Sequence, residues 1–432
     1  MPNDEWETFV KDPRTKCKYG ENCYQKNPEH HKSYKHPPKT QKAAKNTREK
    51  NRFSPFTRKP KAAENENDQT NENDQLETDK KGEETSEVIH DNKQKQVPSS
   101  SVVLNNPPDV EDLPVKLPDS IKFYDTSADP KLLKDLFLVD MPQDFFKFFE
   151  CLNKDNSIEK MLASVGLQLI GPFDLLLGKL PMVDDNNLYL VHWRFFFDPP
   201  EFQAILKRKG ASQFHIGYYR DSPEEKPVFL ASNDSEKDCR ILPVAENIFG
   251  AVYLYLQNEK KKSPFTAMAC QKLIDLLKKT ADEEKFSLEA YTMKKRQGKL
   301  IARTLHGAGI IVPYNKKTQL GYRNLAETDE NLKKIFTSIK EATSHDEKQK
   351  ALSDLQPMIT YADIAVDECD FGTGLEAGID LFCSGLKELQ SRALSSLTSV
   401  YNLLNREAFS KIIQAHLKYR RKGSNLSILD FK

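Results

Sequence analysis

The sequence has no long apolar run and few cysteines. No apolar stretch approaches the ~20 residues that a helix needs to span a bilayer, and the first residues do not show the basic-then-apolar order of a secretory leader. The seven cysteines have no spacing that indicates a disulfide framework. We therefore expect a soluble, intracellular protein with reduced core thiols and no membrane partner.

Apolar residues are also scarce for a chain of this length. Of the 432 residues, 38% are hydrophobic and 30% are charged, and the mean hydropathy is -0.67. The net charge of +1 conceals a basic stretch over residues 38–60 and an acidic stretch over residues 61–100. Both hold almost no aliphatic side chains, so they cannot bury enough apolar surface to offset the entropy of ordering. We predict a disordered charged linker over residues 38–112.

The basic half of this linker has three open interpretations. Lysine and arginine recur between residues 45 and 61. Such a segment is compatible with a nuclear address, with non-specific contact to nucleic acid, or with a solvated tether.

Two thiols and two imidazoles lie close together near the N-terminus. They are Cys17, Cys23, His30 and His36. Zinc takes four such ligands in a tetrahedron, and a segment this polar has no other evident means of ordering itself. Chance cysteines beside solvated histidines are the alternative. We predict one zinc site, and no sequence-specific DNA binding, because no recognition helix fits between Cys23 and His30.

From about Leu113 the composition becomes that of a globular domain. We predict a folded body over residues 113–420 and a flexible tail over residues 421–432. Strand patterns occur at residues 188–197, 214–219, 228–231, 239–242 and, broken by glycines, 300–313. Helical patterns occur at residues 144–152, 247–257, 268–279, from 329 onward and at 386–419. The expected fold is α+β, a mixed sheet with packed helices and a mainly helical C-terminal half.

Acidic side chains punctuate an apolar stretch at residues 359–383. They are Asp363, Asp367, Glu368, Asp370, Glu376 and Asp380, and glycines stand at positions 372, 374 and 378. A buried carboxylate is costly unless paired, and exposed acids beside glycines are typical of a site that a ligand approaches. A helix that ends at Gly372 with its acids solvated is the alternative that composition favours. A calcium loop is not expected, because the alternate-residue spacing is missing.

Tyr322 and Arg323 form a second unusual feature. They follow a polar turn at residues 315–319, in a predicted loop. A tyrosine–arginine pair in such a loop is either surface decoration or an anchor for a partner protein.

The N-terminal motif resembles the poly-ADP-ribose-binding PBZ finger. The matching residues are Cys17, Tyr19, Gly20, Cys23, Tyr24, Asn27, His30, His36 and Pro37. The resemblance implies a PBZ-type finger at residues 1–37 in which Tyr19, Tyr24 and Asn27 contact poly-ADP-ribose, the two rings by stacking on adenine. Such stacking is worth roughly 1–3 kcal/mol per base. Gln25 stands where the family usually has arginine, which removes a charge-assisted contact to phosphate.

The body is similar to the histone PARylation factor family over about residues 119–417. The matching strings are at residues 166–174, 192–203, 217–223, 306–309, 321–323 and 367–382. The resemblance implies a nuclear protein, at damage sites on chromatin, that is no enzyme by itself. It docks on the catalytic domain of a DNA-damage-activated poly-ADP-ribose polymerase and redirects ADP-ribosylation to serine, notably on histones. NAD is then used by the polymerase and is not bound by this chain alone.

The same resemblance assigns residues. It implies that Glu368 is the catalytic base, with Asp367 in support, and that Tyr322 and Arg323 contact the polymerase. Two other functions stay open from the residues. One is a non-catalytic adaptor that reads poly-ADP-ribose through the finger and does not need Glu368. The other is an ADP-ribose hydrolase, which the absence of a macrodomain-like glycine-rich loop disfavours.

Overall fold

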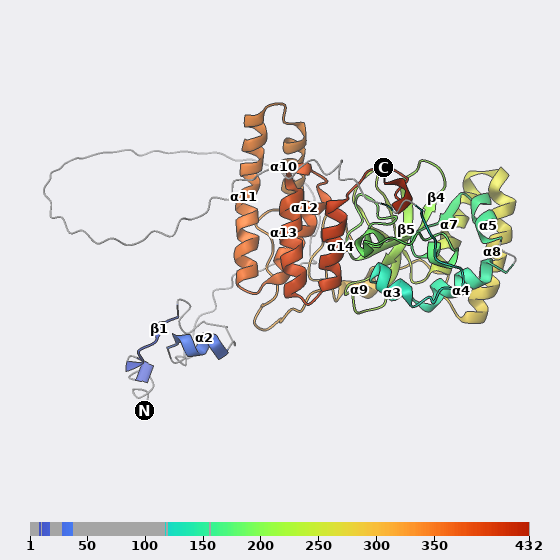
Figure 1. Ribbon diagram of the computed structural model, residues 1–432. Coiled ribbons are helices and arrows are strands. Elements are labelled where there is room, and N and C mark those ends of the chain that lie inside the picture. The colour runs from blue at the N-terminus through green and yellow to red at the C-terminus, as the bar shows by residue number, and fades with distance from the viewer. Residues whose placement is uncertain are drawn as a thin grey trace, which may run out of the picture. The chain divides into compact units, whose positions relative to one another are not determined.

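The computed structural model describes residues 8–9, 11–17, 28–37, 117, 120–154 and 157–431 (Figure 1). The chain divides into two units, residues 1–73 and residues 74–432. The predicted linker at residues 38–112 lies outside the described residues. So do Tyr19, Cys23, Tyr24, Gln25 and Asn27 of the predicted finger, together with the side chain of His30.

The described residues of the N-terminal unit include a short pair of parallel strands. Strand β1 (Thr15–Lys16) pairs with β2 (Tyr34–Lys35), which directly follows helix α2 (Pro28–Ser33). The backbone N–H of Cys17 donates to the carbonyl of Lys35 at 3.0 Å. Because the two strands run in the same direction, Cys17 and His36 follow them at the same end.

The body contains a five-stranded sheet whose order follows the sequence. Its strands are β3 (Leu167–Leu169), β4 (Phe202–Arg208), β5 (Phe214–Tyr219), β6 (Phe229–Asp234) and β7 (Leu242–Ala245). All four pairings are antiparallel, where we expected a mixed sheet. Each strand pairs with its successor in sequence. The connections from β4 to β7 contain no helix that would return the chain in parallel, and only the connection from β3 to β4 includes helical segments, at Phe173–Leu176 and Asn186–Leu190.

Helices cover this sheet and form the rest of its core. They are α3 (Leu132–Phe137), α4 (Gln143–Leu152), α5 (Ile158–Ser164), α6 (Phe173–Leu176), α7 (Ile248–Lys262) and α8 (Pro264–Glu284), with the 3-10 helix η3 (Asn186–Leu190). Asp144 joins α4 to strand β5 and to α7, because its Oδ2 accepts from the Tyr218 hydroxyl at 2.7 Å and from the Ile248 N–H at 2.8 Å. Burial nevertheless raises the pKa of this carboxyl.

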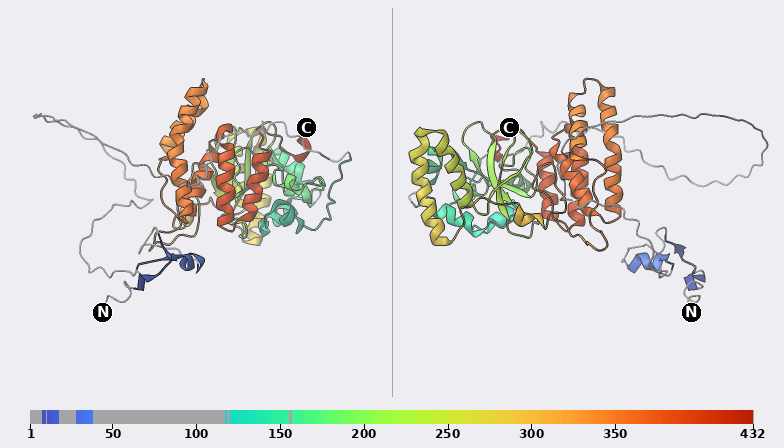
Figure 2. Two further views of the ribbon diagram at one scale, coloured as in Figure 1. Left: turned by 60° about the vertical axis from the view of Figure 1, so that its left-hand side comes forward. Right: turned by 180° about the vertical axis from the view of Figure 1, so that it is seen from behind.

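The C-terminal half is a helical bundle at one end of the body (Figures 1 and 2). After α9 (Lys294–Gln297) come α10 (Asp329–Glu341), α11 (His345–Asp367), α12 (Phe371–Cys383), α13 (Lys387–Leu403) and α14 (Glu407–Lys418), and the short η4 (Ile428–Asp430) ends the chain. Helix α12 is the central one, since every residue from Gly372 to Cys383 is buried. The predicted α+β class with a helical C-terminal half is confirmed.

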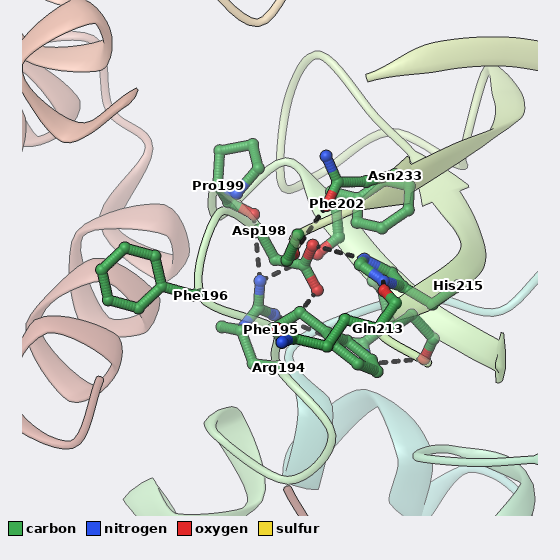
Figure 3. A network of polar contacts seen from close by, with 12 residues as sticks. Arg194, Phe195, Phe196, Asp198, Pro199, Phe202, Gln213, His215 and Asn233 are labelled. Atoms are coloured by element: carbon green, nitrogen blue, oxygen red, sulfur yellow. Dashed lines mark hydrogen bonds and ion pairs between the residues drawn. The ribbon is translucent and has the colours of Figure 1, made fainter. Parts of the chain in front are cut away.

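A polar network beneath the sheet connects the two halves. Figure 3 shows His215 of β5 directed at Asp198, and Phe196 directed toward the bundle. His215 Nε2 lies 2.7 Å from Asp198 Oδ1, and its ring stacks on Phe195 at 3.8 Å. Arg420, just after α14, donates to the Phe196 carbonyl at 2.8 Å. Its guanidinium also lies over the Phe196 ring, 3.9 Å from the ring centroid. The sheet and the bundle therefore form one packed body.

Two sequence-based assignments are wrong. Residues 188–197 form no strand but the end of η3 and a series of turns, with Trp193 in the left-handed region at φ 57°. The buried guanidinium of Arg194 donates to the carbonyls of Leu190, Pro199 and Phe202, which fixes this folded-back path. The predicted flexible tail is also packed. Leu426 and Ile428 are buried, and the N–H of Ile428 donates to His192 Nδ1 at 3.1 Å.

Of the remaining predicted strands and helices, some are confirmed and others are displaced or incomplete. The strand at residues 214–219 and the helices at 247–257 and 268–279 are confirmed. The strand predicted at 239–242 is displaced to β7, and β3 and β4 were not predicted. In residues 300–313 only Ala302 and Ile310 pair. The expected close backbone approach is present there, because a Cβ on Gly309 would lie 2.9 Å from the Ala302 carbonyl oxygen. None of the helices over the described ranges is long and apolar enough to cross a membrane.

Candidate functional site

The acidic stretch forms a corner between two helices. Helix α11 ends at Asp367, and Cys369 takes the left-handed conformation at φ 68°. The N–H of Asp370 then donates to the Ala365 carbonyl at 2.8 Å, and that of Cys369 to Val366 at 2.9 Å. This is the Schellman ending of a helix, usually made with glycine at the left-handed position. The turn brings Asp367, Glu368 and Asp370 to the end of α11, immediately before α12.

Glycines 372, 374 and 378 do not open this corner to a ligand. All three lie inside α12 and are buried. A Cβ on Gly374 would lie 2.2 Å from Val366 Cγ2 and 2.9 Å from Val400 Cγ2, so the glycine is needed for α11 and α13 to approach α12. Our reading of the glycines as a mark of ligand approach is therefore wrong. The alternative of a helix ending at Gly372 is also wrong, because that residue belongs to the first turn of α12.

The loop that carries Arg323 is bound to this corner. Arg323 Nη2 lies 2.6 Å from Glu368 Oε2, and its Nε lies 2.5 Å from Asp370 Oδ2. The second oxygen of Asp370 accepts from the N–H of Gly321 at 2.7 Å. Thr373 accepts from the Arg323 N–H at 2.9 Å and donates to its carbonyl at 2.7 Å. Two predicted features, far apart in sequence, are thus joined in one site.

The exposure of the charged groups divides them into two kinds. Asp370 retains 7% side-chain exposure, whereas Glu368 retains 27% and Arg323 23%. Asp367 is exposed and has no ion pair among the described residues. Burial lowers the pKa of Arg323, but its hydrogen bonds with Glu368 and Asp370 more than compensate, so the pKa lies above its usual value. Asp370 therefore anchors the arginine, while Glu368 keeps partial access to solvent.

Tyr322 points the other way, into the bundle. Its hydroxyl donates to Glu376 Oε2 at 2.9 Å, and Glu376 itself is buried within α12. Burial is the main reason that the pKa of Glu376 rises to about 8, and burial next to Glu376 also raises the pKa of Tyr322. Tyr322 is partly exposed, and its hydrogen bond to Glu376 ties the loop to α12.

Sequence reasoning did not assign roles to Asp370, Thr373 and Glu376. Each holds the loop 321–323 through a contact across about fifty residues of sequence. Asp380, one turn further along α12, accepts from the Leu305 N–H at 2.8 Å, and burial raises its pKa well above the usual value. In the sequence, these residues stand within an apolar helical repeat. That pattern indicates that they are buried, but it does not indicate which residues they contact.

The predicted zinc ligands are only partly described. Cys17 is 2% exposed, and the imidazole rings of His31 and His36 lie 4.7 Å apart. A buried thiol and a partly buried imidazole at the same end of a strand pair suit zinc, which prefers sulfur and nitrogen ligands. Among the residues that the structure describes, no group of three or more potential ligands occurs. Cys23 and the His30 side chain lie outside that set.

Comparison with known proteins identifies both parts of the chain. Residues 129–420 match the Histone PARylation factor 1 family, and residues 14–39 match the PBZ domain. Histone PARylation factor 1 of Bos taurus is 41% identical over 303 residues, 67% of this chain and 86% of that protein. The Danio rerio protein of that name is 40% identical over 319 residues, 72% of this chain and 91% of that protein. The chain belongs to the Histone PARylation factor 1 family, and both resemblances are confirmed.

We expect the burial of Glu376 to make stability depend on pH, since burial raises the pKa of this carboxyl against the opposing hydrogen bond from Tyr322. The pKa of Glu376 is about 8 in the folded protein and 4.5 as its ordinary value. Between pH 4.5 and pH 8, the folded protein therefore keeps a proton on Glu376 that the unfolded chain has lost. Its contribution to the free energy of unfolding is therefore complete below pH 4.5 and falls as pH rises to about 8, by up to about 1.4 kcal/mol per pH unit. Glu376→Gln should reduce this slope in urea titrations.

The matched control is Glu341→Gln, on an exposed position of α10. It should keep the wild-type slope. An equal slope in the wild type and in Glu376→Gln would show that Glu376 is ionised in the folded protein, contrary to this account.

Proposed function

We propose that the chain is an accessory factor for a poly-ADP-ribose polymerase and supplies a base for ADP-ribosylation of serine. The observation that carries the proposal is the pairing of Arg323 with the accessible Glu368. Membership of a family named for histone PARylation supports the reaction class. The chain then has no activity alone, and its partners are the catalytic domain of the polymerase, histones and poly-ADP-ribose. We place this activity in the nucleus, at damage sites on chromatin.

The chemistry explains why a carboxylate is needed. A serine hydroxyl is a weak nucleophile near neutral pH, so its attack on the anomeric carbon of the NAD ribose requires removal of its proton. In the proposed step the serine oxygen forms a bond to that carbon, the bond to nicotinamide breaks, and Glu368 receives the hydroxyl proton. A carboxylate acceptor needs no such base. Supplying Glu368 from a second protein therefore changes the residue that is modified.

Arg323 has two roles in this proposal. Its ion pair orients the Glu368 carboxylate, and its partly exposed guanidinium meets an acidic group of the polymerase. Fixing the base and the contact through one side chain couples docking to the alignment of the base. Asp367, exposed beside Glu368, adds negative charge that attracts basic histone tails.

The finger adds recognition of the reaction product. Zinc would be held by Cys17, Cys23, His30 and His36, and it would order this polar segment. Tyr19, Tyr24 and Asn27 would contact poly-ADP-ribose, with adenine stacked on the two rings. Binding the polymer raises the local concentration of the factor where modification is already under way. The competing function, an adaptor without a catalytic role, requires the finger but not Glu368.

We predict that Glu368→Gln abolishes transfer to serine and leaves docking intact. The amide keeps the shape of the side chain but cannot accept the serine proton. Transfer from labelled NAD to a peptide with one serine and no acidic residue should fall at least ~100-fold, the usual contribution of a general base. Affinity for the polymerase domain should stay within about twofold, since Asp370 still holds Arg323 in place. Full serine transfer by this variant would favour the adaptor.

We predict that Arg323→Ala weakens docking by about tenfold or more, because a charge that is desolvated at an interface is lost. The dissociation constant for the polymerase catalytic domain is the measurement. Lys334→Ala, which removes an exposed cation of α10, is the matched control and should bind normally. Equal affinity of wild type and Arg323→Ala would place the docking contact elsewhere.

The two adjacent histidines test the zinc assignment. His30→Gln should lose bound zinc, as should Cys23→Ala, whereas His31→Gln should retain it, because only His30 is among the four predicted ligands. Zinc per chain, measured by plasma mass spectrometry, and binding of poly-ADP-ribose should change together. Retention of zinc by His30→Gln would refute this ligand set.

A further inference from the structure

Helices α7 and α8 meet in a tip that exposes two large apolar side chains. Phe265 and Met268, near the start of α8, are 97% and 84% exposed. They stand three residues apart, so they lie on the same face of the helix. Among the described residues, no other large apolar side chain is more than 53% exposed. Two neighbouring apolar side chains exposed to this degree indicate a surface that a partner covers.

Lysines surround this apolar pair. The α7–α8 tip, residues 259–272, contains one acid and four exposed lysines, Lys260, Lys261, Lys262 and Lys272. The acid, Glu259, is shared between two cations, because its Oε1 lies 2.9 Å from Lys262 Nζ and 2.9 Å from Arg208 Nη2. Lys260 donates to the neutral amide oxygen of Gln271 at 2.6 Å. Four lysines against one acid leave the tip with a net charge of +3.

The α7–α8 tip lies away from the acidic corner. Figures 1 and 2 show α7 and α8 at one end of the body, beyond the sheet, and α10 to α13 at the opposite end. A partner that covers the tip therefore leaves Glu368 and Arg323 open for the polymerase.

Duplex DNA matches both features of the tip. Its phosphates attract lysine ammonium groups without demanding a fixed geometry, and such contacts carry no sequence information. Proteins that bind the minor groove also press apolar wedges between base steps, and phenylalanine and methionine are among the residues that do so. The exposed pair Phe265 and Met268, flanked by lysines, has this composition.

Other anionic partners satisfy only part of the tip. An acidic peptide would pair with the lysines but would leave Phe265 and Met268 in water unless it also brought an apolar pocket. An anionic lipid surface holds a protein through buried apolar area, of which two side chains supply little. We propose that the α7–α8 tip is a sequence-independent contact surface for duplex DNA. The inference rests on the proposed function, because a factor that directs modification to histones works beside DNA.

The salt dependence of DNA binding tests the lysines. Full-length protein is titrated into a fluorescent duplex of mixed sequence at several salt concentrations. Each phosphate contact contributes about 0.9 to the slope of log Kd against log salt concentration. The slope should fall by about two to three when three lysines of the tip are replaced together, by Lys260→Gln, Lys261→Gln and Lys272→Gln. An unchanged slope would overturn the proposal and assign any DNA binding to the basic stretch at residues 38–60.

The matched control for charge removes three exposed lysines of α10, by Lys333→Gln, Lys334→Gln and Lys340→Gln. This variant loses the same charge and should keep the wild-type slope. An equal fall in both triple variants would show a response to net charge alone and would overturn the proposal.

Removal of the apolar pair should lower affinity without changing the slope. Phe265→Ala combined with Met268→Ala should weaken DNA binding by about fivefold or more, because contact with the bases is lost while the charge stays the same. Leu242→Ala, which removes a 53% exposed apolar side chain of β7, is the control and should bind as wild type. Unchanged affinity of the double variant would overturn the assignment of the tip to DNA.

Two further measurements guard this interpretation. All replaced side chains are exposed, so each variant should keep the wild-type melting temperature. Vesicles of phosphatidylserine are the second probe, and the tip variants should leave any vesicle binding unchanged. Loss of vesicle binding in the tip variants, with DNA binding intact, would show a lipid surface instead and would overturn the proposal.

Transfer assays separate this proposal from the proposed function. With polymerase and NAD, the triple lysine variant of the tip should modify serine on nucleosomes about threefold more slowly or worse than wild type, because DNA no longer raises its local concentration. It should modify a free histone peptide at the wild-type rate. Tip-dependent DNA binding with no transfer to serine on either substrate would leave the tip assignment standing and refute the role of Glu368. Equal nucleosome rates for this variant and wild type would refute the tip assignment alone.

Discussion

The pairing of the Arg323 guanidinium with both Glu368 and Asp370 is the interaction on which the site depends. It joins a loop to the corner between α11 and α12, so that a carboxylate with access to solvent is held in one orientation. The more buried Asp370 holds the arginine and leaves Glu368 at the surface. A guanidinium suits this task because its planar fork binds two carboxylates in fixed geometry, which a lysine ammonium does not. The corner is therefore organised before any partner arrives.

The buried helix α12 gives this corner its rigid support. Gly374 lets α11 and α13 pack against it, and Glu376 holds Tyr322 of the same loop that carries Arg323. A carboxyl that keeps its proton near neutral pH is less costly to bury than a carboxylate, which is how α12 tolerates acids in an apolar environment. Packing and polar contacts thus fix the loop 321–323 through the side chains of both Tyr322 and Arg323.

The sequence predicts much of this protein, and its failures have physical causes. Periodicity located β5, α7 and α8, since their apolar patterns reflect local packing. It failed at residues 188–197, whose aromatic run has the composition of a strand, because the path there is set by the buried Arg194 and by carbonyls that come together only in the fold. Family motifs singled out Glu368 and Arg323, but not their contact. The supporting Asp370 and Thr373 look unremarkable in sequence because their role exists only across the loop–helix interface.

We propose that the chain joins a finger for poly-ADP-ribose to a body that offers a base, and that it thereby changes which residue a polymerase modifies. Mass spectrometry of a histone tail after reaction with the polymerase, alone and together with this protein, measures that directly. We expect ADP-ribose on aspartate and glutamate in the first reaction and on serine in the second. An unchanged set of modified residues would contradict the proposed role of Glu368.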